Sequence, residues 1–212
     1  MLADGSQVTG LAEHRSGEEQ QPTWSPYGNK IAYMVWDGSL GIDPEIRKMS
    51  SDGTNETTLR ERRCGCGDAS PAWSPDGNKI VFVSTRRYKS DIFKMNRDGS
   101  NLRRLTKTPW DELNPDWSPD GDRIVFDRGD GNDREIFKMN PDGSRVRKVT
   151  HNARNDREPT WSPDGNRIAF VHDGLQDSEI FTMRPDGSRW DRVTHNRRFE
   201  SAPDWQPRPS GS

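Results

Sequence analysis

The amino-acid sequence predicts an all-β protein built from repeated four-stranded sheets, which is the organisation of a β-propeller. Two short motifs recur along the 212 residues. The first is Trp-Ser-Pro, with a degenerate fifth copy that reads Trp-Gln-Pro, and its copies begin at Trp24, Trp73, Trp117, Trp161 and Trp205. The second is Asp-Gly followed by Ser or Thr, and its copies begin at Asp4, Asp52, Asp98, Asp142 and Asp186. A period of about 44 residues, without any helical apolar stripe, is typical of a propeller blade.

The copy that begins at Trp117 shows how one repeat divides into four strands. Residues 114–117 are short and extended, and Ser-Pro-Asp-Gly at 118–121 has the residues that a tight turn needs. Residues 123–126 form an apolar strand, 127–134 a polar loop, and 135–139 a strand that alternates with a period of two. A second turn at 140–144 leads to the alternating segment 146–150. The polar residues that follow then cross from the outermost strand of one blade to the innermost strand of the next.

Composition and charge exclude several classes of protein. Leu, Ile, Val and Phe make up only 33 of the 212 residues, a fraction typical of disordered chains, but their recurrence at fixed repeat positions indicates a core divided among blades. The formal charge of −2 lacks the excess of basic residues that a nucleic-acid binder needs. No apolar stretch is long enough to span a bilayer, and the N-terminus lacks the features of a signal peptide. The two cysteines, Cys64 and Cys66, are too few for a disulfide scaffold.

The string Pro-x-Trp-Ser-Pro-Asp-Gly, followed by Ile-Phe-x-Met and Asp-Gly-Ser, resembles the WD40-like repeat of TolB-type β-propellers over roughly residues 1–206. The resemblance implies a non-catalytic binding or scaffold module for a protein or peptide partner, in the periplasm or outside the cell. A cytoplasmic location stays open because this sequence has no signal peptide. Two alternatives also stay open: a substrate-gating propeller segment of a prolyl-oligopeptidase-like hydrolase, and an amplified or engineered propeller fragment that closes by oligomerisation.

The repeats predict four complete blades and two strands of a fifth. Residues 1–21 are expected to hold the outer strand of a split blade and the first crossover, residues 22–206 the tandem repeats, and residues 207–212 a disordered tail. The two strands of the split blade, at residues 4–11 and 202–205, are an outer and an inner strand, which do not pair with each other in a blade. We therefore expect the chain to associate with itself through the incomplete blade.

An acidic residue stands five positions before every repeat Trp, and the row is Glu19, Asp68, Glu112, Asp156 and Glu200. Acidic residues make up 34 of 212 positions, about one in six, so five out of five is not a chance result. One interpretation is structural: each carboxylate accepts hydrogen bonds in the crossover or pairs with an Arg. The other is a ring of carboxylates at the mouth of the channel that binds a cation or a basic partner segment.

A second acidic row precedes the Ile of each third strand, and a basic row opens each second strand. The acidic residues are Glu45, Asp91, Glu135 and Glu179, and the basic residues are Lys30, Lys79, Arg123 and Arg167. Because the two rows lie on adjacent strands, we expect them to form cross-strand ion pairs.

Three further residues are candidates for binding. Trp110 lies in a crossover beside the acidic row and is a candidate anchor for a partner peptide. Asp130 and Asp133 bring oxygen ligands together on one loop and are weak candidates for a Ca²⁺ site. Apart from this calcium the sequence predicts no cofactor, and it contains no nucleophile elbow, phosphate-binding loop or zinc-protease motif, so no residue is predicted to be catalytic.

Overall fold

The computed structural model describes residues 10–11, 18–37, 42–59, 67–86, 89–130, 133–196 and 198–205, and these form four antiparallel four-stranded sheets. Blade one contains β1 (Glu18–Trp24), β2 (Lys30–Asp37), β3 (Ile42–Ser50) and β4 (Thr57–Thr58). Blade two contains β5 (Gly67–Trp73), β6 (Lys79–Arg86), β7 (Lys89–Asn96) and β8 (Arg103–Arg104). Blade three contains β9 (Asp111–Trp117), β10 (Ile124–Gly129), β11 (Glu135–Met139) and β12 (Arg147–Lys148). Blade four contains β13 (Asp156–Trp161), β14 (Ile168–Asp173), β15 (Ser178–Met183) and β16 (Asp191–Arg192).

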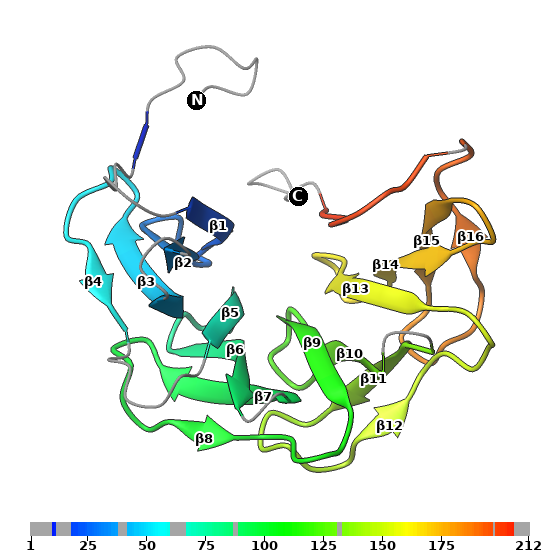
Figure 1. Ribbon diagram of the computed structural model, residues 1–212, viewed down its shortest axis with the longest axis horizontal. Helices are drawn as coiled ribbons and strands as arrows, with labels where there is room; N and C mark the ends of the chain where they lie inside the picture. The colour runs from blue at the N-terminus through cyan, green and yellow to red at the C-terminus, as the bar shows by residue number, and fades with distance from the viewer. Residues whose placement is uncertain are drawn as a thin grey trace.

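The four blades follow one another along an arc around a common axis (Figure 1). The first strand of each blade lies nearest the axis and the short fourth strand lies at the rim, as the sequence predicts. The all-β propeller of four complete blades is therefore confirmed. The described part of the chain contains no helix that could cross a membrane.

The turn between the first two strands is built from the Ser-Pro-Asp-Gly motif. In blade three, Gly121 has a φ of 76° and donates its N–H to the Ser118 carbonyl. The Ser118 hydroxyl accepts the N–H of Arg123 at 2.9 Å, and the Asp120 carboxylate accepts the hydroxyl proton of Ser118 at 2.5 Å. The motif thus satisfies its own backbone groups, and it recurs in blades two to four. Blade one has Tyr27 in place of the aspartate.

The Asp-Gly-Ser turn before each fourth strand also joins neighbouring blades. Gly143 has a φ of 86°, and a Cβ atom at that position would lie only 2.6 Å from the carbonyl oxygen of Leu105 in the preceding blade. Only glycine tolerates both the positive φ and this close approach. Gly53 meets the carbonyl of Leu11 in the same way, so Leu11 occupies the place that Leu105 occupies in blade two.

The core consists of clusters between adjacent blades rather than one central cluster. Each of three repeat tryptophans fills such an interface, and their exposed fractions are 8%, 8% and 9% for Trp73, Trp117 and Trp161. Trp24 occupies the same repeat position in blade one but is 56% exposed. The low content of apolar residues is therefore sufficient, because each blade buries its few large side chains against the next.

The prediction that the second acidic row pairs with the basic row is wrong. In an antiparallel hairpin the first residue of one strand faces the last residue of the other, so Lys79 faces Asn96 and Asp91 faces Ser84. The Lys79 ammonium donates to Asn96 Oδ1 at 2.5 Å instead. In blades two to four the acidic row pairs with the fourth strand: Asp91 with Arg104 at 2.6 Å, and likewise Glu135 with Lys148 and Glu179 with Arg192. In blade one Glu45 instead pairs with Arg47 of its own strand at 2.7 Å.

The fifth repeat keeps the local geometry of an inner strand without forming a sheet within the described residues. Ala202 has a φ of 48°, which matches the positive φ three residues before every other repeat Trp. The Ala202 N–H donates to Glu158 Oε2 at 2.5 Å, and the Trp205 indole donates to the Thr160 carbonyl at 3.2 Å, so the segment lies on blade four. Of the predicted outer strand, residues 4–9 lie outside the described residues, as do Cys64, Cys66 and the tail at 207–212.

Candidate functional site

The first acidic row lies at the start of the inner strands, and its four members in the complete blades each face one residue of the second strand of the same blade. The pairs in register are Glu19 with Val35, Asp68 with Ser84, Glu112 with Arg128, and Asp156 with His172. The residue opposite the carboxylate differs from blade to blade, so each carboxylate has its own surroundings.

Glu112 is buried, and three side chains of the protein donate hydrogen bonds to its carboxylate. Its Oε1 accepts from the Arg128 guanidinium at 2.9 Å and from the Thr108 hydroxyl at 2.5 Å, and its Oε2 accepts from the Thr106 hydroxyl at 3.1 Å. Thr106 Oγ1 in turn accepts the Ile92 N–H at 2.9 Å. Burial raises the pKa of the Glu112 carboxyl, and these hydrogen bonds and the Arg128 charge oppose that rise.

Asp156 has equivalent surroundings in blade four. It lies 2.6 Å from His172 Nδ1, and its Oδ2 accepts from the Asn152 amide at 2.7 Å. Burial raises its pKa, and the hydrogen bonds from His172, Thr150 and Asn152 counteract that rise. Asn152 also donates its backbone N–H to Glu135 at 2.8 Å, so the Thr-His-Asn turn connects the two acidic rows.

The remaining members of the row differ in exposure. Asp68 is buried, Glu200 is half-buried, and Glu19 at the first blade of the arc is exposed. Glu200 accepts from the Asn196 amide at 2.6 Å, as Asp156 does from Asn152. The described residues contain no group of three or more His, Cys, Asp or Glu arranged to hold a metal ion. Hydrogen bonds from the crossover and from the second strand thus account for Glu112 and Asp156, and a channel-mouth cation or partner site stays a prediction.

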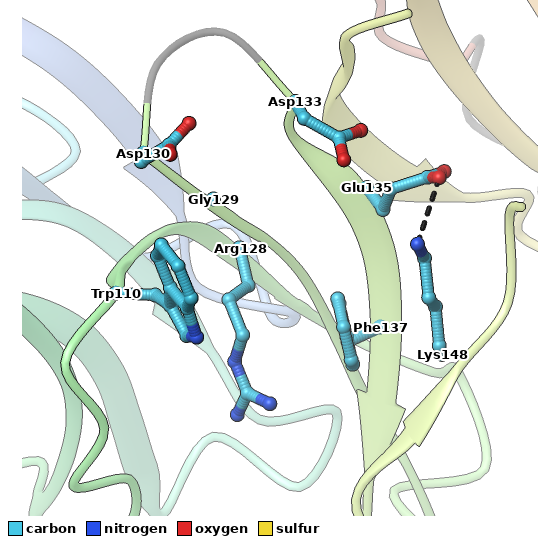
Figure 2. Close-up of a pocket in the computed structure, with 8 residues that line it drawn as sticks. All are labelled: Trp110, Arg128, Gly129, Asp130, Asp133, Glu135, Phe137 and Lys148. Atoms are coloured by element: carbon cyan, nitrogen blue, oxygen red, sulfur yellow. Dashed lines mark ion pairs between the residues drawn. The ribbon is translucent and has the colours of Figure 1, made fainter. Parts of the chain in front are cut away.

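A pocket of about 170 Å³ in blade three brings together Trp110, Asp130 and Asp133, which the sequence singled out separately. Trp110 comes from the crossover before β9, and the two aspartates flank the hairpin between β10 and β11 (Figure 2). The other lining residues are Arg128, Gly129, Glu135, Phe137 and Lys148.

A cation–π contact, two ion pairs and a hydrogen bond hold the residues of this blade-three pocket in place. The Arg128 guanidinium lies over the Phe137 ring at 4.5 Å while it pairs with Glu112. Glu135 pairs with Lys148 at 2.9 Å (Figure 2). Trp110 is 46% exposed, and its backbone N–H donates to Thr108 Oγ1 at 3.2 Å, which fixes the crossover at the pocket's edge. The pocket can therefore accept an apolar group beside Trp110 and a cation beside the aspartates.

Sequence reasoning missed Arg128, Phe137 and Lys148 as parts of a site. The available signal was departure from the repeat: Arg128 stands where the other blades have Val35, Ser84 and His172. Trp110 departs in the same way, because Arg154 stands 44 residues later at the equivalent position.

A buried ion pair in the same blade was also missed. The Asp127 carboxylate is fully buried, and Arg134 donates to its Oδ2 from Nη2 at 2.6 Å and from Nε at 2.7 Å. The other carboxylate oxygen accepts from the Asn114 amide at 2.8 Å and from the Glu158 N–H at 3.2 Å. Burial raises the pKa of Asp127, and the Arg134 charge opposes the rise. The pair connects blades three and four because Glu158 belongs to β13.

Comparison with known proteins agrees with the geometry. The family model for the TolB beta propeller domain, PD40, matches residues 6–132 and 108–211. The chain belongs to the TolB β-propeller family. No curated protein sequence gives a match to this TolB-family chain.

Solved structures show how far the similarity of this TolB-family propeller extends. TolB from Acinetobacter baumannii has a TM-score of 0.78 and 22% identity, over 91% of this chain and 47% of that chain. A putative TolB from Agrobacterium tumefaciens has a TM-score of 0.69 and 22% identity, over 83% of this chain and 80% of that one. An oligogalacturonate lyase from Vibrio parahaemolyticus has a TM-score of 0.64 and 18% identity, over 86% and 55% respectively. At these identities the likeness shows the fold alone, and the chain spans less than half of the Acinetobacter protein.

Proposed function

We propose that this TolB-family propeller is a non-catalytic module that binds a protein or peptide partner at the blade-three pocket. The observation that carries the proposal is Trp110, which is 46% exposed at the edge of a pocket that also contains the Phe137 ring. Packing between blades does not require a tryptophan there, because Arg154 takes its place in the next repeat. Exposed tryptophans beside apolar pockets are frequent anchors for partner proteins.

The charges around the pocket favour a partner with a basic group next to its apolar anchor. Arg128 and Lys148 are each paired with a glutamate, and Asp130 and Asp133 are exposed. A lysine or arginine of the partner would meet these aspartates while its apolar neighbour contacts Trp110. Among the described residues that line the pocket there is no Ser, Cys or His, the side chains most often used in nucleophilic catalysis, which supports a binding role.

Selection from a displayed peptide library tests the proposal. We expect peptides that combine an aromatic or large apolar residue with a basic one, and we expect Trp110→Ala to weaken them by at least about ten-fold. Trp36→Ala is the matched control, since Trp36 is 44% exposed and lies on β2, outside the pocket. Failure to enrich any peptide, or equal binding to the Trp110 and Trp36 variants, would refute the proposal.

The location and the cation are further parts of the proposal. A periplasmic or extracellular location follows from the family resemblance, and fractionation of cells that express the natural gene tests it.

Calcium at Asp130 and Asp133 is supported by their exposed carboxylates on one hairpin. Calorimetric titration of Ca²⁺ into the intact protein, compared with Asp130→Asn and with a Glu112→Gln, Asp156→Asn double variant, separates that site from the acidic row. An absence of heat would leave both carboxylate sets with structural roles only.

Self-association is supported by the two ends of the arc. Trp24 is 56% exposed, against 8–9% for its three buried counterparts. Val193 at the other end is 55% exposed, whereas Leu59 and Val149, at the same repeat position, are 7% and 6% exposed. These faces match the two sides of an internal blade interface, so a second copy of the chain fits them.

A further inference from the structure

The hairpin between β6 and β7 in blade two is basic at two positions where the other blades have an aspartate or a glycine. Six residues after the Ile of each second strand, the sequence has Asp37, Arg86, Asp130 and Gly174 in blades one to four. Three residues before the Ile of each third strand, it has Asp43, Lys89, Asp133 and Asp177. Blade two alone is basic at both positions. A role in folding shared by all blades cannot explain this reversal.

Arg86 and Lys89 also face each other directly in the antiparallel register. Like charges at directly opposed positions of adjacent strands destabilise a sheet. Two cationic side chains therefore meet at this hairpin.

The two residues line a pocket of about 590 Å³ together with Arg104, Lys107, Thr108 and Pro109. Four of these six described lining residues are cationic and none is acidic. The blade-three pocket, by contrast, is lined by three acidic residues.

Two of the cations are fixed and two are adaptable. The Arg104 guanidinium pairs with the buried Asp91 at 2.6 Å and donates to the Thr106 carbonyl at 2.8 Å. The Arg86 guanidinium lies 4.5 Å above the Phe93 ring. Lys107 is exposed, and the Lys89 side chain is 47% exposed and lies 3.9 Å from Asp111. Arginines held by contacts beside exposed lysines suit carboxylates, which accept from both kinds of donor.

We propose that this blade-two pocket binds the acidic side chains of a peptide segment of the partner. The inference rests on the proposed function, because Thr108 and Pro109 line this pocket and the next residue, Trp110, lines the blade-three pocket. One extended segment that crosses the 105–110 crossover would place its aromatic and basic residues at Trp110 and its acidic residues in blade two. The small extent of the basic surface, within a chain of net charge −2, favours a short acidic segment over a nucleic acid.

Fluorescence anisotropy with short labelled peptides tests this inference. The probe is a peptide of alternating Glu and Gly, with a Gln-Gly peptide and inorganic phosphate as comparisons. We expect the Glu peptide to bind the wild-type protein, more weakly as salt is raised, and Lys107→Glu to reduce its affinity about five-fold or more. Arg103→Glu is the matched control, because Arg103 is exposed on β8, four residues before Lys107, and does not line the pocket, and its replacement makes the same change in net charge.

Several outcomes would overturn the inference. They are no binding of the Glu peptide, equal binding of the Gln peptide, an equal loss in the Arg103 variant, or competition by phosphate at the concentration of the peptide itself. Library peptides that depend on Trp110 but bind the Lys107 variant normally would overturn only this inference. A library that yields no peptide would instead overturn the proposed function, even if the Glu peptide bound.

Discussion

Replacing Arg134 by Ser is expected to destabilise the propeller strongly, because it leaves the Asp127 carboxylate buried without its counter-charge. Arg134 makes two hydrogen bonds to Asp127 at 2.6 and 2.7 Å, and the exposed fractions of the two side chains are 10% and 0%. Removing one partner of such a pair typically costs about 3–5 kcal/mol of unfolding free energy. In a protein of this size that loss lowers the melting temperature by roughly 6–20 °C.

The other blades supply the control for this substitution. At the positions of Asp127 and Arg134, blade two has Val83 and Ser90, and blade four has Val171 and Ser178. The double variant Asp127→Val, Arg134→Ser introduces the residues of blades two and four at these positions and removes both charges. We expect it to recover most of the loss, leaving about 1–2 kcal/mol because the Glu158 N–H and the Asn114 amide lose their acceptor.

Urea unfolding followed by both tryptophan fluorescence and circular dichroism measures these free energies, and coincident curves justify a two-state treatment. A single Arg134 variant that loses less than about 1 kcal/mol would show that water or a rearranged side chain compensates the carboxylate. A double variant as unstable as the single one would show that the pair, and not the isolated charge, is what the fold requires.

Two further predictions concern pH and assembly. Burial raises the pKa of Asp116 to about 6, although its carboxylate accepts the Trp161 N–H at 2.8 Å. The folded state therefore binds more protons than the unfolded state between about pH 4 and pH 6, so stability should fall by about 2 kcal/mol as the pH rises through that range. Asp116→Asn should flatten this slope in unfolding experiments at several pH values, and an unchanged slope would assign it to other groups. Sedimentation of the intact chain should show dimers or larger species that Trp24→Glu shifts toward the monomer, whereas a monomer at all concentrations would contradict self-association.

Much of the fold could be predicted from the sequence because its determinants are local. Ser118 to Gly121 and the equivalent segments close their own turns, and Gly143 must be glycine for its positive φ. These signals repeat every 44 to 49 residues, so strand order and blade boundaries follow without tertiary information. The acidic positions Glu112 and Asp156 were found in the same way.

The pairing of charges could not be predicted in the same way. The mistaken pairing of Lys79 with Asp91 came from treating adjacent strands as aligned at their starts, whereas the antiparallel register places those residues at opposite ends. The partners of Glu112 and Asp156 depend on Arg128 and His172, which follow no repeat.

The sequence by itself determined the all-β architecture, the four complete blades and the positions of the recurrent carboxylates, because a repeat imposes the same local conformation wherever it occurs. Only the tertiary structure decided which carboxylates accept hydrogen bonds from within the protein and which residues lie together in pockets. Trp110 joins Phe137, and Lys107 joins Arg86, because a crossover folds back over a hairpin distant in sequence. The side chains that distinguish this propeller therefore lie where single blades depart from the repeat. What those side chains do depends on contacts between segments that are not at equivalent repeat positions, and the sequence period does not predict such contacts.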